Sequence, residues 1–178
     1  EHTGDTETCE VWVAEGTYYI HGSDATSTNH QLDRILLAPD VLVYGGFQAG
    51  AADMDARDWT EFPTVLSGCD DADCAERVHH VVVARDHSHL DGFFITGGFA
   101  TDSTSSTLDD DGGGLFIYET EDVVIRNTHF FGNRADDSGG GLAISGGENV
   151  RIEDCVFTGN EGYADGSAFD VSLSDDVE

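Results

Sequence analysis

Aspartates gather immediately before three glycine-led segments of this chain. They occupy six positions: Asp109, Asp110, Asp111, Asp136, Asp137 and Asp165. Glycines follow them directly or after one serine, as in 112–114 and 139–141. Carboxylates are preferred ligands of Ca²⁺, which takes about six to eight oxygen atoms from carboxylates, carbonyls and water. The pattern predicts a Ca²⁺ site along one edge of the fold. The alternative is an acidic edge whose charges are only solvated and screened by salt.

Two histidines, His87 and His89, are a second candidate for metal chemistry. Alternate residues of a β-strand point to the same face, so the two imidazoles could ligate one transition-metal ion. No third ligand is evident beside them. We therefore interpret the histidines as turn and surface residues. The sequence also has no zinc-ligand spacing, no nucleophile elbow and no phosphate-binding loop.

The elements that would position these residues come from an internal repeat. Residues 112–138, GGGLFIYETEDVVIRNTHFFGNRADDS, are followed by a second copy at 139–165, GGGLAISGGENVRIEDCVFTGNEGYAD, and a third copy begins at Gly166. Self-similarity at a fixed period is the signature of a repeat architecture. Apolar residues alternate within each copy, and no window shows sustained helical periodicity. The pattern predicts an all-β parallel β-helix with about 27 residues and three short strands per rung.

The repeat also predicts which side chains stack on one another. Leu90, Ile125 and Ile152 share one column, which we expect to point inward. The corresponding outward column holds Asp91, Arg126 and Glu153. Cross-strand pairs of opposite charge contribute about 0.2–1 kcal/mol each. We interpret the outward column as a feature that sets the register of the strands.

Composition limits the possible partners. The chain has 36 acidic and 7 basic residues, a net charge of -29, and every basic residue is arginine. Phosphate groups would be repelled, which argues against nucleic acid and anionic membrane surfaces. No apolar run approaches the length of about 18 residues that membrane insertion requires. The acidity favours a surface adapted to salt, as in marine or halophilic proteins, because salt screens self-repulsion.

Four cysteines leave the redox state of the chain open. Cys69 and Cys74 lie in the polar loop GCDDADCAER and could close a small ring, or could both remain thiols. A bridge between them would indicate an environment outside the cytoplasm. Cys155 falls on the column of Thr128, which predicts a buried and unreactive thiol. Cys9 opens the first expected strand.

We expect one domain over residues 1–178. Residues 9–77 would form less regular coils and a cap, 78–171 the regular rungs, and 172–178 a polar tail. The chain stops within a rung and shows no obvious cap there. An uncovered coil end is an unpaired sheet edge that a second copy could cover, which makes end-to-end self-association a possibility.

Six segments in a fixed order carry a resemblance to a known family. They are VWVAEGTYY, VLVYGGF, ARDWTEFPTVLSG, HHVVV, LDGFFITGG and GGGL…FFGN…GGGL…FTGN. Over about residues 9–171 the chain resembles the right-handed parallel β-helix repeat proteins of bacterial surfaces, relatives of the polymorphic outer-membrane protein repeats in the pectin-lyase-like superfamily. The resemblance implies a secreted or cell-surface β-helix, often an adhesin. In that family the Gly-Gly-Gly-Leu and Phe-x-Gly-Asn elements are structural.

The same superfamily contains lyases and glycosidases, so polysaccharide cleavage is the enzymatic alternative. A glycosidase needs two carboxylates at a fixed separation, but with 36 acids any single pair is uninformative. A lyase needs a base, commonly lysine or arginine. Lysine is absent, and Arg126 and Arg151 have acids beside them. These features favour a non-catalytic structural or adhesive surface protein, stabilised by Ca²⁺ and with a glycan or surface partner. The alternatives are a fibre subunit stacked end to end, and a polysaccharide lyase or glycoside hydrolase.

Overall fold

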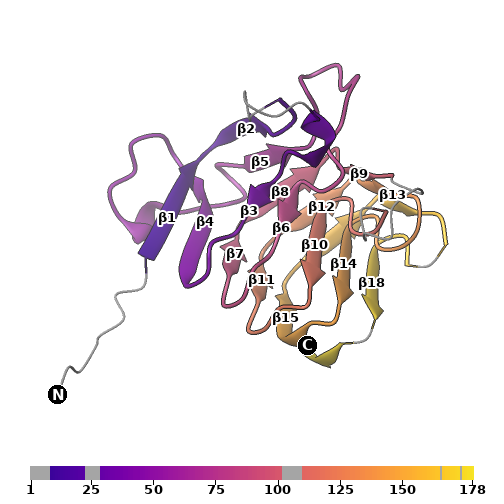
Figure 1. The fold of residues 1–178 in the computed structure, drawn as a ribbon. Coiled ribbons are helices and arrows are strands. Elements are labelled where there is room, and N and C mark those ends of the chain that lie inside the picture. The colour runs from indigo at the N-terminus through magenta and orange to yellow at the C-terminus, as the bar shows by residue number, and fades with distance from the viewer. Residues whose placement is uncertain (1–8, 23–28, 102–109, 165, 173) are drawn as a thin grey trace.

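A computed structural model describes residues 9–22, 29–101, 110–164, 166–172 and 174–178. In these residues the chain coils through parallel strands, and successive coils stack along one axis from the N-terminal strand β1 to the C-terminal strand β19 (Figure 1). Two 3-10 turns, η1 (His30–Leu32) and η2 (Met54–Ala56), are the only helical segments described. No helix in the described part of the chain has the length and apolar character needed to span a membrane.

Four parallel sheets form the walls of the coil. The first contains, in spatial order, β1 (Cys9–Ala14), β4 (Val41–Phe47), β7 (His89–Asp91), β11 (Val124–Arg126), β15 (Glu148–Glu153) and β19 (Asp175–Val177). The second contains β18 (Phe169–Ser172), β14 (Leu142–Ser145), β10 (Leu115–Tyr118), β6 (Val82–Val83) and β3 (Ile35–Leu36). The third contains β16 (Val156–Thr158), β12 (His129–Phe131), β8 (Phe93–Thr96), β5 (Thr64–Ser67) and β2 (Gly16–Tyr19). The fourth contains β17 (Glu161–Gly162), β13 (Arg134–Ala135) and β9 (Phe99–Ala100).

The repeat offset of 27 residues sets the pairing of the last coils. Leu115 pairs with Leu142, and the same offset joins β11 to β15 and β12 to β16. This confirms the predicted parallel β-helix. The prediction of three strands per rung was wrong, because each regular rung has a fourth. Arg134–Ala135 is extended between the Phe-x-Gly-Asn turn and the next glycine triplet, and pairs with equivalent dipeptides on both sides.

The core consists of inward columns of apolar side chains. Leu90 and Ile125 are fully buried, and the partly buried Ile152 packs against this core from the coil that follows Ile125, as predicted. Phe130 is fully buried, and its ring stacks on Phe157 with centroids 4.9 Å apart. Burial of each such side chain stabilises the fold by about 1.5–3 kcal/mol.

The two repeated motifs are structural in this chain. Gly114 lies so close to the next coil that a Cβ atom there would be 2.3 Å from the carbonyl oxygen of Gly141, so no larger residue fits. Asn133 is buried, and its side chain accepts a hydrogen bond from the Gly98 N–H (3.0 Å) and donates one to the Ile95 carbonyl (2.9 Å). Asparagine at this position therefore hydrogen-bonds neighbouring coils together.

Residues 48–63 lie between β4 and β5 and contain no strand. Asp53 caps η2, and Asp58 accepts hydrogen bonds from Thr60 and from the Glu61 N–H, which lower the pKa of its carboxyl group. These aspartates thus close local turns. The segment returns to the coil through Arg57, which contacts the first sheet.

Candidate functional site: an acidic edge and two clefts

The predicted acidic edge is partly assembled. The Asp137 N–H donates to the Asp110 carbonyl oxygen (3.0 Å), and the Ser138 N–H donates to the Asp111 carboxylate (2.9 Å). Asp110 and Asp137 therefore lie on neighbouring coils, at the predicted offset. Burial raises the pKa of Asp111, and nearby Asp137, Asp110 and Asp170 raise it further.

The remaining residues of the acidic edge add little to the predicted Ca²⁺ site. Asp136 accepts hydrogen bonds from the Thr101 hydroxyl (2.6 Å) and from the Arg134 guanidinium (3.1 Å), so its carboxylate is already neutralised. Asp109 and Asp165 lie outside the described residues. Within the described part of the chain, no group of three or more His, Cys, Asp or Glu side chains is arranged to hold a metal ion.

The two candidate metal-binding histidines have different surroundings. His87 is a turn residue in the left-handed backbone region, with its Nε2 atom 3.3 Å from the Asp122 carboxylate. His89 lies in β7 and packs on the ring of Tyr44 with centroids 5.4 Å apart. The turn interpretation fits His87, whereas His89 is largely covered and is not a surface residue.

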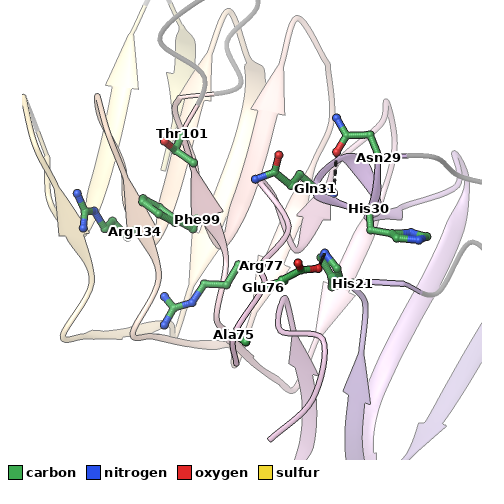
Figure 2. Close-up of a pocket in the computed structure, with 10 residues that line it drawn as sticks. All are labelled: His21, Asn29, His30, Gln31, Ala75, Glu76, Arg77, Phe99, Thr101 and Arg134. Atoms are coloured by element: carbon green, nitrogen blue, oxygen red, sulfur yellow. Dashed lines mark hydrogen bonds and ion pairs between the residues drawn. The ribbon is translucent and has the colours of Figure 1, made fainter. Parts of the chain in front are cut away.

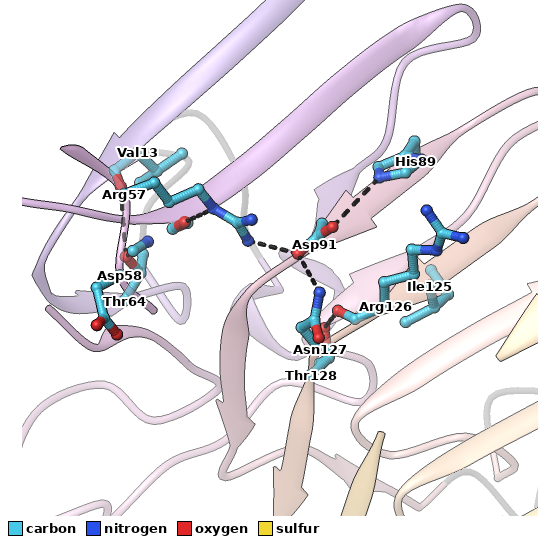
Figure 3. Close-up of polar contacts among 12 residues, drawn as sticks. Val13, Arg57, Asp58, Thr64, His89, Asp91, Ile125, Arg126, Asn127 and Thr128 are labelled. Atoms are coloured by element: carbon cyan, nitrogen blue, oxygen red, sulfur yellow. Dashed lines mark hydrogen bonds and ion pairs between the residues drawn. The ribbon is translucent and has the colours of Figure 1, made fainter. Parts of the chain in front are cut away.

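A buried ion pair connects β7 with the segment 48–63 (Figure 3). The guanidinium of Arg57 donates to the Asp91 carboxylate and, through Nε, to the Gly45 carbonyl (2.7 Å). Asn127 adds a hydrogen bond to Asp91 (2.9 Å). Arg126, the expected neighbour in the outward column, pairs instead with Glu153. The column has the predicted register, but its first carboxylate anchors a distant segment.

The four cysteines form one disulfide and two free thiols. Cys69 and Cys74 form a disulfide, the open alternative that would indicate an oxidising environment. Cys155 is only partly buried, not fully as predicted, but burial raises the pKa of its thiol to about 11, in agreement with the predicted unreactive cysteine. Cys9 is a free and exposed thiol.

The first cleft, which we call the aromatic cleft, lies on the outer face of the second sheet. It has a volume of about 290 Å³, and its lining includes the apolar Leu36 and the rings of His80, Phe116 and Tyr118. Phe116 stacks between the rings of His80 (5.1 Å) and Tyr118 (5.9 Å), and both ring pairs are within 16° of parallel. Tyr118 is 43% exposed and Leu36 47% exposed, so the row ends in accessible apolar surface.

The second cleft, the arginine cleft, is larger, about 780 Å³ (Figure 2). Figure 2 shows Arg77, Phe99 and Arg134 along one side of it and His21 and His30 along the other. The Arg134 guanidinium lies 4.7 Å from the centre of the Phe99 ring. The lining comes from the loops after β2 and β5 and from strands β9 and β13, which are distant in sequence.

Sequence reasoning missed both clefts. The arginines carried a signal for the arginine cleft. With seven arginines and 36 acids in the chain, every arginine would be expected to form an ion pair, and an arginine without one is notable. Yet only Arg57, Arg126 and Arg134 form ion pairs with residues that the structure describes. The predicted pairing of Arg151 is not found among those residues. Arginines without an ion pair in the described part of the chain are candidate binding groups for anionic ligands.

Comparison with known proteins gives one match. The family model described as a right-handed β-helix region matches residues 81–175, slightly more than half of the chain. The matched segment begins just before β6 and covers the regular rungs, including Phe116, Tyr118 and Arg134. No curated protein and no solved structure matches the chain.

Proposed function

Because this chain belongs to the right-handed β-helix family, we propose that it is a non-catalytic binding protein of the extracellular space, with a glycan as its ligand. The observation that carries this proposal is the row of stacked rings in the aromatic cleft. The row of parallel rings ends in the exposed ring of a tyrosine, which offers a flat apolar surface. The C–H groups on the face of a sugar ring can pack on such a surface. A folded sheet holds that surface rigid before the ligand arrives, which reduces the entropic cost of binding.

Polar side chains at the rim of the aromatic cleft complete the argument. Arg85, Asp86 and Glu119 line it and can exchange hydrogen bonds with sugar hydroxyls. Both acids are engaged within the protein: Tyr118 donates to Glu119 (2.9 Å), and Asp86 accepts from the Glu121 N–H (3.2 Å). Carboxylates that serve as local acceptors support binding rather than glycosidic cleavage, which requires a free acid and base pair.

Three observations support the extracellular location. The Cys69–Cys74 disulfide is typical of proteins outside the reducing cytoplasm. The surface proteins that the chain resembles point the same way. An acidic surface with a net charge of -29 is also suited to a salty medium, where screening weakens self-repulsion.

Substitution of Tyr118 by alanine should weaken glycan binding about tenfold or more, because it removes the exposed flat surface. Binding to a glycan panel would first identify a ligand, and titration calorimetry would then compare the variants. Tyr163→Ala is the matched control, since Tyr163 is 83% exposed and lies outside the cleft. Equal affinity of wild type and Tyr118→Ala would contradict the proposal.

Two further measurements test the alternative functions. Release of reducing or unsaturated sugars from a glycan would support the enzymatic alternative. Growth of particle size with protein concentration would support the fibre alternative.

We also propose that Ca²⁺ stabilises the fold at the acidic edge. Like charges on Asp110, Asp111 and Asp137 repel one another, and a divalent cation would remove that cost. In thermal unfolding at fixed NaCl, millimolar Ca²⁺ should raise the midpoint by several degrees, because a ligand of the folded state stabilises it. Mg²⁺ and the variant Asp111→Asn are the controls. A rise that Mg²⁺ reproduces, or that survives Asp111→Asn, would return the edge to the solvated interpretation.

A further inference from the structure

The arginine cleft contains a cation that no residue in the described part of the chain neutralises. Arg77 is only partly exposed, and its guanidinium makes no hydrogen bond or ion pair with any residue that the structure describes. Arg134, on the same side of the cleft, is held by Asp136 and by the Phe99 ring. Arg77 is thus a cation with open hydrogen-bonding capacity beside a fixed guanidinium–aromatic wall, in a chain with a fivefold excess of acids.

The geometry points to a small hydroxylated monocarboxylate, and we propose that its carboxylate binds the Arg77 guanidinium. A guanidinium offers a planar fork of N–H donors that matches the two oxygens of a carboxylate. The cleft volume of about 780 Å³ is in the range of small-molecule sites. Gln31 and Thr101 also line the cleft and supply amide and hydroxyl groups for the hydroxyls of the ligand.

Charge selects a single negative group over a multivalent anion. The exposed Glu76 lies at the rim, with its carboxylate 3.4 Å from the imidazole of His21, and the whole chain carries a net charge of -29. A dianion such as sulfate would meet twice the long-range repulsion of a carboxylate. Sulfate is also tetrahedral and cannot exploit the cleft as a flat group does. The site therefore differs from the aromatic cleft in location, in lining and in ligand charge.

Titration calorimetry with gluconate, at constant NaCl, tests this assignment. Gluconate should bind, whereas glucose, which lacks the carboxylate, and sulfate should bind at least about tenfold more weakly. Arg77→Gln should weaken gluconate binding about tenfold or more. Arg151→Gln is the matched control, because Arg151 is exposed in β15, has no ion pair among the described residues and gives the same change of charge. That variant should bind gluconate within about twofold of wild type.

Failure to fold would not explain a loss of binding here. The Arg77 guanidinium has no hydrogen bond or ion pair to lose among the described residues, so Arg77→Gln should leave the unfolding midpoint within about 2 °C of wild type. Arg77→Lys is the second variant, which keeps the charge but removes the planar fork, and it should also bind more weakly. Equal binding of glucose and gluconate would overturn the proposal. So would wild-type affinity in both Arg77 variants, or sulfate binding as tight as gluconate.

Discussion

Replacement of Asn133 by alanine is expected to lower the free energy of unfolding by about 3 kcal/mol or more. The side chain is buried, accepts from the Gly98 N–H and donates to the Ile95 carbonyl. Alanine leaves the buried Gly98 N–H without its acceptor and removes the hydrogen bonds to the Ile95 carbonyl and to the Asn160 side chain, and a buried group left unsatisfied costs about 1–3 kcal/mol. Urea unfolding measures the loss directly. For a chain of this size, a heat-induced unfolding midpoint about 6–12 °C lower should accompany it.

Asn160 provides a graded control for Asn133, because it holds the same motif position one coil later. Its side chain accepts from the Asn133 N–H (3.1 Å) and donates to the Phe130 carbonyl (3.0 Å), but the residue is only partly buried. Groups left unsatisfied there can bond to water. Asn160→Ala should therefore cost clearly less than Asn133→Ala. Equal losses at the two positions, or a loss below 1 kcal/mol at Asn133, would contradict the role given to burial.

The repeat made the regular coils predictable in detail. Residues that are 27 apart must meet when every rung has the same length, so the sequence alone predicts that Leu115 pairs with Leu142. The direction of each column followed from the two-residue period of a strand. The fourth strand was harder to predict because a dipeptide such as Arg134–Ala135 carries no alternation of its own. Only its neighbours Phe99–Ala100 and Glu161–Gly162 make it a strand.

The clefts could not be predicted because they combine segments outside the repeat. The arginine cleft joins His21 and Arg77, from loops with no fixed period, to Arg134 in a regular rung. The aromatic cleft is different, since Phe116 and Tyr118 alternate within one strand and share its outer face. Their stacking was therefore accessible from the sequence. What the sequence could not supply is His80, which comes from just before β6 and completes the row.

In the outward column the strand register was predicted correctly, but the ion-pair partner of Asp91 was not. The predicted column correctly placed Asp91 beside Arg126, which lie 35 residues apart in the sequence. The counter-charge of Asp91 is nevertheless Arg57, which lies 34 residues earlier in the irregular segment 48–63. That segment covers the carboxylate, so a pair that would have been a surface contact becomes a buried one.

Substitution of Asp91 by alanine should therefore destabilise the protein by about 3–5 kcal/mol, measured by urea unfolding at neutral pH. The side chain of Arg57 is only 15% exposed, and removal of one partner of a buried pair leaves the other charge uncompensated. Glu153→Gln is the matched control in the same column. Its partner Arg126 is far more exposed, and an exposed pair contributes about 0–1 kcal/mol. Similar losses for the two variants would contradict the distinction between them.

The pH dependence of the same pair gives a second measurement. Burial alone would raise the pKa of Asp91, but the nearby His89, the Asn127 amide and the Arg57 guanidinium outweigh it and hold the pKa well below its usual range. The unfolded chain has an aspartate pKa of about 3.9. The stabilisation by Asp91 is therefore complete above that value and is lost as the pH falls below it. Asp91→Asn keeps the shape without the charge. The difference in unfolding free energy between wild type and Asp91→Asn should be constant from pH 7 to about 5 and shrink below about pH 4. It shrinks because protonation of Asp91 then removes from the wild type the charge that the variant already lacks. A difference that does not change with pH would mean that packing, and not the ion pair with Arg57, holds segment 48–63 on the coil.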